Sequence, residues 1–167
     1  NSGSPLLNLQ GEVVGLVADV IGGPAGIGGI GVAVPGDLVA QSIADLERFG
    51  VPQRGWLGAS LISLDELPPV LLRAVGLTST QGAMVDRVEP GSPAARAGLK
   101  GAQRDTQGRL LALGDVILAV DGVAVKDKAD VVRLVAQRRP GDRVRLTLWR
   151  DRRRLEVTVV LMARPRE

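Results

Sequence analysis

The chain has 167 residues and is 45% hydrophobic, which is enough for one domain or two small ones and excludes a disordered composition. It contains no cysteine and no histidine, so disulfides, thiolate metal sites, cysteine catalysis and the commonest general base are excluded within this chain. The net charge is only +3, from 21 basic and 18 acidic residues. Twenty-two glycines and ten prolines indicate many turns and short elements, which favours a mainly β fold with minor α content.

The first 50 residues predict three strands followed by one helix. The strand-like runs are 6–9, 12–21 and 30–34. Gln10-Gly11 predicts a hairpin turn between the first two. Apolar residues then recur at helical spacing after Asp37, a predicted N-cap, and Gly50 ends the pattern. We place a linker at 51–54, between a unit at 1–50 and a second unit at 55–167.

The second unit predicts five or six short strands with helices between them, the content of a small capped β-sandwich or barrel. The predicted strands are 56–62, 82–88, 115–120 with the strand after it, 143–149 and 155–161. Ser63–Glu66 matches a capping box, which predicts a helix from there to about Val75. Ser92–Ala97 predicts a short helix and Asp127–Arg138 a longer one, while 101–110 reads as a polar loop. Asp121-Gly122 is a strong tight-turn signal.

The first six residues, Asn1–Leu6, resemble the turn that carries the nucleophile of trypsin-like serine proteases. Ser2 falls on the family's serine, and the resemblance implies that it is the nucleophile and supplies one oxyanion N–H. The runs Leu7–Gly15 and Ile30–Pro35 resemble the HtrA/DegP branch in particular. Ser4 stands where the family has a second glycine, which is tolerated if the backbone there does not need positive φ. Residues 1–50 are therefore expected to be the end of a protease domain, an incomplete trypsin-like β-barrel.

The motif Arg54–Ala59 resembles the carboxylate-binding loop of HtrA-type PDZ domains, in which two apolar residues flank a glycine. Gly58 lets consecutive N–H groups converge on one anion. Three further runs match PDZ domains: Glu89–Leu99, Gly114–Ile117 and Val120–Gly122.

The PDZ resemblance implies a peptide-binding site in which an extended C-terminal segment adds to the edge of a strand. We expect it to be formed by Trp56, Leu57, Gly58, Ala59, Leu61, Val131 and Val135. Leu57, Gly58 and Ala59 would donate to the peptide's carboxylate, and the helix that carries Val131 and Val135 would form the opposite wall. Ala59 is smaller than the residue usual in the family, which predicts a roomy terminal pocket for residues such as Phe or Leu.

Taken together, the resemblance implies part of an HtrA/DegP-like serine endopeptidase of protein quality control that needs no cofactor. The family's catalytic His and Asp precede the serine and lie outside this chain, so we expect the chain to be inactive alone. Implied partners are unfolded or C-terminal peptide segments, and the parent is expected to be extracytoplasmic, periplasmic or membrane-tethered, and trimer-based. The alternative is a stand-alone peptide-binding or scaffolding PDZ module. A chain opening at Asn1 rather than Met would have lost any targeting segment of a longer parent.

Nucleotide binding, nucleic-acid binding, metal binding and membrane insertion are less well supported by the sequence. The run Gly26–Gly31 fits a dinucleotide-binding pattern, but it leads into a strand rather than a helix. The arginine cluster Arg152–Arg154 is flanked by acids and lacks aromatic platforms, so a solvated hairpin tip is favoured over nucleic-acid binding. No metal-ligand spacing is present. No apolar run reaches the roughly 18 residues of a membrane span, so membrane contact is not expected within the chain.

Overall fold

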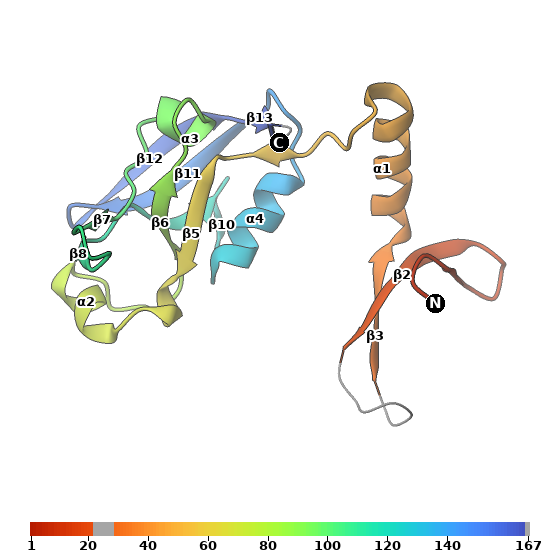
Figure 1. Ribbon diagram of the computed structural model, residues 1–167, viewed down its shortest axis with the longest axis horizontal. Helices are drawn as coiled ribbons and strands as arrows, with labels where there is room; N and C mark the ends of the chain where they lie inside the picture. The colour runs from red at the N-terminus through yellow and green to blue at the C-terminus, as the bar shows by residue number, and fades with distance from the viewer. Residues whose placement is uncertain (22–28, 166–167) are drawn as a thin grey trace. The chain divides into compact units, whose positions relative to one another are not determined.

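The computed structural model describes residues 1–21 and 29–165, and the chain forms two compact units, Asn1–Gln53 and Arg54–Glu167. Strands dominate over helices, so the predicted mainly β class is confirmed (Figure 1). The glycine-rich run Gly26–Gly31, for which a dinucleotide site was not favoured, includes positions 26–28, which lie outside the described residues. In the part of the chain that is described, no helix has the length and hydropathy needed to cross a membrane.

The first unit is an antiparallel three-stranded meander followed by one helix. Its strands are β1 (Pro5–Leu7), β2 (Val13–Ile21) and β3 (Ile30–Pro35), in the order β1-β2-β3. The β1–β2 turn closes where predicted, because Asn8 Oδ1 accepts from the N–H groups of Gln10 and Glu12 at 3.0 and 2.9 Å.

The helix of this unit, α1 (Gly36–Phe49), begins two residues earlier than predicted. Asp37 lies in the first turn and is not the N-cap, a position that Pro35 occupies. A Cβ on Gly36 would lie 2.7 Å from the Val13 carbonyl oxygen, so glycine lets the helix start in close contact with β2. Gly50 ends the helix as predicted, with φ of +71° and its N–H donating to Leu46 O.

The second unit is built on an antiparallel sheet in the order β12-β11-β9-β6-β5, with β10 paired to β9. The sheet strands are β5 (Ala59–Ser63), β6 (Ala83–Val88), β9 (Val116–Val120), β10 (Val123–Ala124), β11 (Arg143–Arg150) and β12 (Arg153–Val160). Two small ladders join it, β4 (Gly55–Trp56) with β13 (Met162–Ala163) and β7 (Gln103–Arg104) with β8 (Leu110–Ala112). The helices are α2 (Pro69–Ala74), α3 (Pro93–Arg96) and α4 (Lys128–Ala136).

The core of this unit is aliphatic, as the scarcity of aromatic residues requires. Fully buried positions on the central strands include Val85, Ile117, Leu146 and Leu148, and α4 packs Val131 against them. A second buried cluster, around Leu64 and Met84, lies under α2. The sheet is therefore covered on both sides, which fixes the positions of β5 and α4.

Three local predictions for this unit need correction. The capping box at Ser63–Glu66 forms, but it starts a short 3-10 turn (Leu64–Glu66) instead of a helix running to Val75. Pro68 and Pro69 interrupt the helix because proline lacks an N–H and disfavours helical φ/ψ in the residue before it. The polar stretch 101–110 is no simple loop, since it contributes β7 and part of β8. The predicted strand at 56–62 is broken at Leu57-Gly58 into β4 and β5.

Candidate functional site

A groove of about 230 Å³ lies between β5 and α4, which run side by side in Figure 1. Its lining residues come from the β4–β5 segment, from α4 and from the chain just after β13. They are Arg54, Gly55, Trp56, Leu57, Gly58, Ala59, Leu61, Val131, Val132, Val135, Ala136 and Arg164. All seven residues that the sequence nominated for peptide binding are thus brought together in one place.

The break between β4 and β5 shapes one end of the groove. Gly58 has φ of +74°, and a Cβ there would lie 2.2 Å from Ser92 Cβ. The carbonyls of Leu57 and Gly58 accept from the N–H groups of Ala94 and Glu89, each at 2.9 Å. The loop is therefore anchored by its carbonyls to the segment that leads into α3.

The N–H groups of the same two residues are left without partners. Among the described residues, no acceptor bonds to the backbone nitrogen of Leu57 or Gly58, although both residues are buried. Buried backbone donors are rarely unpaired, because the desolvated N–H forfeits a hydrogen bond to water. Two backbone donors at this end of the groove are consequently available to an acceptor from outside the chain.

The groove carries positive charge and no acidic residue in its lining. Arg54 and Arg164 line it, and neither forms an ion pair with any described residue. The pairing of β13 with β4 places Ala163 opposite Gly55, which brings the two arginines onto neighbouring chain positions at the groove's end. The two unpaired cations therefore give the groove a positive potential that favours an anionic ligand.

Helix α4 forms the opposite wall and is held at both ends. Asp127 caps its N-terminus by accepting from the N–H of Asp130 at 2.9 Å, and the N–H of Lys128 donates to Ser63 Oγ at 3.2 Å. At the other end Arg138 pairs with Asp121 at 2.7 Å. The side chain of Arg133 and the N–H of Lys126 hold the pKa of Asp130 below its usual value, so this carboxylate stays charged and braces the first turn.

The wall residues differ in part from the sequence prediction. Val131 and Val135 reach the groove but are only 1% and 4% exposed, so they belong mainly to the core. Val132 is 59% exposed and forms the rim. An apolar side chain on a helix face that is otherwise polar was the signal that could have identified it. No pattern in the sequence around Arg164 predicted that it lines the groove, because its position depends on the pairing of β13 with β4.

Ser2 lies in the first unit, in a tight turn beside β2. Its Oγ donates to the carbonyl of Ala18 at 2.8 Å. Gly3 has φ of +88°, whereas Ser4 is not in the positive-φ region, so the condition for serine at that position is met. With no histidine in the sequence, the chain offers this hydroxyl no imidazole base. Among the described residues, no group of three or more His, Cys, Asp or Glu side chains is placed to hold a metal.

Comparison with known proteins identifies the class to which this geometry belongs. Residues 55–161 match the PDZ domain family, and the chain belongs to that family. All 167 residues align at 33% identity with a probable periplasmic serine endoprotease, DegP-like, from Brucella suis, and 162 residues (96% of the chain) at 36% with one from Halomonas elongata. The chain spans 30% and 31% of the length of these two relatives.

Solved structures agree with the sequence relatives. A variant of the HtrA-type protease AlgW with a decapeptide is 30% identical, with a TM-score of 0.73 over 99% of this chain and 46% of that one. The resemblance to HtrA/DegP-type serine proteases is thereby confirmed over the whole chain.

The anchored loop generates a stability prediction. We expect Gly58→Ala to lower the free energy of unfolding by more than about 2 kcal/mol. The alanine would be strained by the positive φ, and its Cβ would also clash with the side chain of Ser92. Gly91→Ala is the matched control, since Gly91 has φ of +72° with nothing within 4 Å, and it should cost only about 1 kcal/mol. Urea denaturation measures both changes, and equal losses would contradict the close-contact explanation.

Proposed function

We propose that the groove between β5 and α4 binds the C-terminal segment of a polypeptide. The observation that carries the proposal is the pair of unpaired N–H groups on the buried residues Leu57 and Gly58, in a groove that two arginines also line. A terminal carboxylate is the anion that an extended chain presents at its end. Charge-assisted hydrogen bonds to it contribute about 1.5–3 kcal/mol each.

The free edge of β5 supports the same occupant. Strand β5 is the last strand in the sheet order, and β6 is its only partner among the described strands. An extended peptide can add there as a further strand, with alternate side chains directed toward Leu61 and α4. The proposed contacts are therefore Trp56, Leu57, Gly58, Ala59, Leu61, Val131 and Val135, together with Val132 on the rim.

We propose further that the chain is part of an HtrA/DegP-like serine endopeptidase of protein quality control, with Ser2 as the family's nucleophile. Residues 1–50 would be the end of the protease domain, 51–54 a linker and 55–167 the PDZ domain. Similarity along the whole chain to DegP-like proteases supports this assignment. The parent would be periplasmic or membrane-tethered, would capture unfolded or C-terminal segments, and would assemble as a trimer, which the family resemblance implies.

A second candidate is a stand-alone peptide-binding module in which residues 1–50 serve only for assembly, a candidate supported by the match of residues 55–161 to the PDZ domain family. The two candidates differ in what the parent gene encodes upstream of Asn1. A His and an Asp in protease context there support the endopeptidase, and their absence supports the module.

The carboxylate proposal predicts that the groove distinguishes an acid from its amide. An apolar-ended peptide with a free C-terminus should bind saturably, and its C-terminal amide at least about tenfold more weakly, because charge-assisted hydrogen bonds are lost. Fluorescence of Trp56 reports binding, with Trp149→Phe removing the other indole. Equal or absent binding of the two peptides would refute the carboxylate site and leave the fold assignment untouched.

The small side chain of Ala59 predicts the preferred last residue. Because Ala59 leaves room beside Leu61, peptides ending in Phe or Leu should bind more tightly than the same peptide ending in Ala. Burial of the larger side chain is expected to gain about 1.5 kcal/mol or more, or roughly tenfold in affinity. Ala59→Leu should reduce the difference by filling the pocket, whereas equal affinities in the unaltered chain would contradict the assignment.

The chain alone is expected to show no proteolysis. Loss of the base leaves the Ser2 hydroxyl protonated, and in subtilisin removal of the serine or histidine lowers turnover by about 10⁶. A labelled-casein assay tests this, with an intact DegP-like protease as the positive control. Turnover that disappears in Ser2→Ala would show that the chain is catalytically competent.

A further inference from the structure

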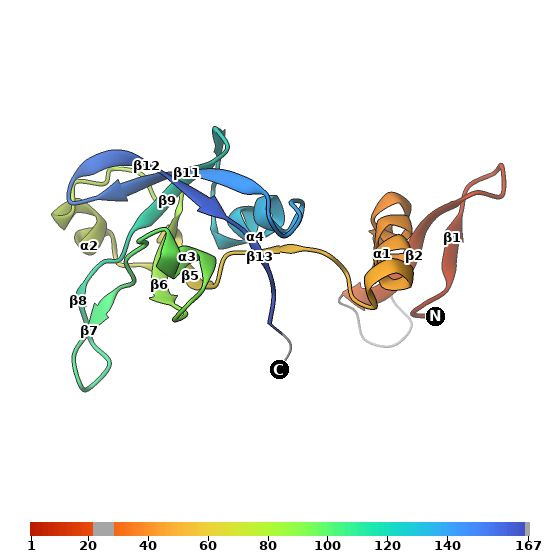
Figure 2. The same cartoon turned by 90° about the horizontal axis from the view of Figure 1, so that it is seen from above.

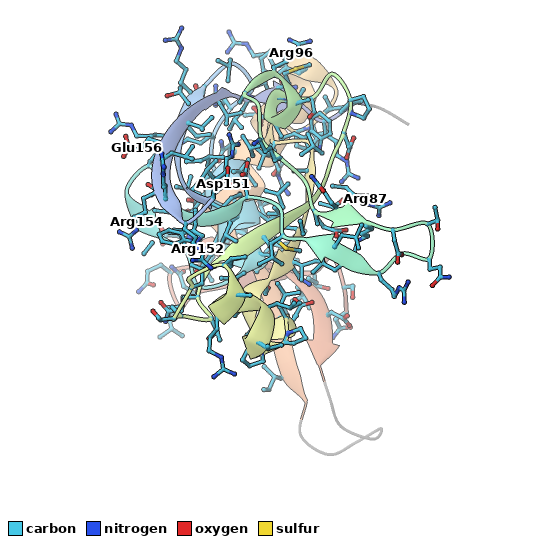
Figure 3. All side chains as sticks on the ribbon, turned by 90° about the vertical axis from the view of Figure 1, so that its left-hand side faces the viewer. Arg87, Arg96, Asp151, Arg152, Arg154 and Glu156 are labelled. Atoms are coloured by element: carbon cyan, nitrogen blue, oxygen red, sulfur yellow. The ribbon has the colours of Figure 1, made fainter. Side chains whose placement is uncertain are left out.

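A cavity of about 540 Å³ lies in the second unit, away from the groove between β5 and α4. Its walls are the end of α2, the segment that begins at Lys100, the chain from β8 into β9, and the tip between β11 and β12. Figure 3 shows one residue of that tip, Arg152, beside α2, whereas Arg154 lies at the outer edge of β12. The volume is within the range of roughly 300–1,000 Å³ that ligand sites occupy.

The walls of this cleft are fixed by hydrogen bonds between segments distant in sequence. Trp149 Nε1 donates to the carbonyl of Val75 at 3.0 Å, and Arg152 Nη2 donates to the carbonyl of Ala74 at 2.8 Å. At the back of the cleft, Arg150 pairs with the buried carboxylate of Asp115 at 2.6 Å. A preformed cleft does not spend binding free energy on ordering its own walls.

Arg152 is held at the cleft by an unfavourable backbone conformation. Asp151 and Arg152 form a two-residue hairpin turn with φ of +49° and +59°, a turn whose second position favours glycine. The same chain has glycine at that position in another two-residue turn, where Asp121 and Gly122 have φ of +49° and +81°. Positive φ in a long side chain is strained, and such strain concentrates at functional positions.

The cleft combines excess positive charge with an apolar wall. Three cationic residues line it against two acidic ones, and one of those acids, Asp115, is buried against Arg150. Lys100 and Arg152 are exposed, and neither forms an ion pair with a described residue. The apolar wall includes Val75 and Leu111, and Leu111 is 68% exposed on β8.

Strand β8 indicates what kind of molecule fits. Among the described strands it pairs only with β7, on a hairpin that projects from the rest of the unit in Figure 2. Its other edge is open beside the cleft, and open strand edges bind extended polypeptide. A carboxylate on the bound segment would complement the unpaired charges of Lys100 and Arg152. An apolar residue next to it would pack against the wall formed by Val75 and Leu111.

We propose that this cleft is a second binding site, which takes an internal polypeptide segment with an acidic residue next to an apolar one. The carboxylate binds between Lys100 and Arg152, and the apolar side chain packs on Leu111 and Val75. The site does not require a chain end, so it works independently of the groove between β5 and α4.

A peptide blocked at both ends tests the site without engaging a carboxylate-reading groove. The probe is acetyl-Gly-Leu-Glu-Leu-Gly-amide, titrated into the ¹⁵N-labelled chain, and its Gln counterpart is the control. Saturable shifts are expected at the indole N–H of Trp149 and the amides of Lys100 and Leu111, with the Gln peptide at least about tenfold weaker. Equal binding of the two peptides, no saturation at millimolar peptide, or shifts confined to the Leu57–Ala59 loop would overturn the proposal.

A substitution in the strained Asp151-Arg152 turn tests whether the guanidinium of Arg152 binds the peptide. Arg152→Gly removes the guanidinium but suits positive φ, so the melting temperature should stay within a few degrees while affinity for the Glu peptide falls at least about tenfold. Arg154→Gln removes the same charge two residues away, outside the cleft, and should leave affinity within about twofold. If Arg152→Gly fails to fold, Lys100→Gln replaces it with the same expectation. Unchanged affinity in the folded cleft variant would overturn the site.

Discussion

The buried carboxylate of Asp115 is the interaction on which the architecture of the second unit depends. It is 1% exposed, and it accepts from Arg150 through both oxygens and from the N–H of Lys100 at 2.8 Å. The backbone of Asp115 also bonds to Val85 and Lys100, so one residue joins β6, β9, β11 and the segment after α3. Removing one partner of such a pair costs about 3–5 kcal/mol, because the other charge is left desolvated. The tip beyond Arg150, and with it the wall of the second cleft, is therefore fixed from inside the unit.

The groove depends on a different constraint, the close approach of the Gly58 backbone to the side chain of Ser92. Glycine at position 58 lets the chain turn while Ser92 lies against it, and the carbonyls of that loop are used internally. Once the carbonyls are engaged on one side, the N–H groups remain as the loop's available backbone polar groups. The same anchoring that stabilises the loop thus creates its affinity for an acceptor. Pairing of β13 with β4 then adds Arg164 from the far end of the sequence.

The sequence correctly predicted those features that depend on interactions between residues close together in the chain. The turn at Asp121-Gly122 and the capping box at Ser63 were found correctly, because each depends on neighbours within a few residues. The predicted start of α1 was wrong because the helix begins where Gly36 lies close to the carbonyl oxygen of Val13, and this is a tertiary contact. The rim of the groove was only partly predicted for the same reason: helical spacing identified the buried face of α4, and only packing shows that Val132 is left at the surface. The cleft beside Arg152 had no sequence signal, since four segments meet there.

The two units differ in how much apolar surface each buries, and therefore in how much free energy each gains from folding. The second unit buries two aliphatic clusters, whereas among the described residues of the first only Gly15 and Asp45 are buried. Ile43, Leu46 and Phe49 are each about half exposed along α1. A unit with so little apolar burial gains little free energy from folding and presents surface suited to covering by further chain. That state fits a chain spanning about 30% of its DegP-like relatives, and it makes the second unit the part whose binding can be studied in isolation.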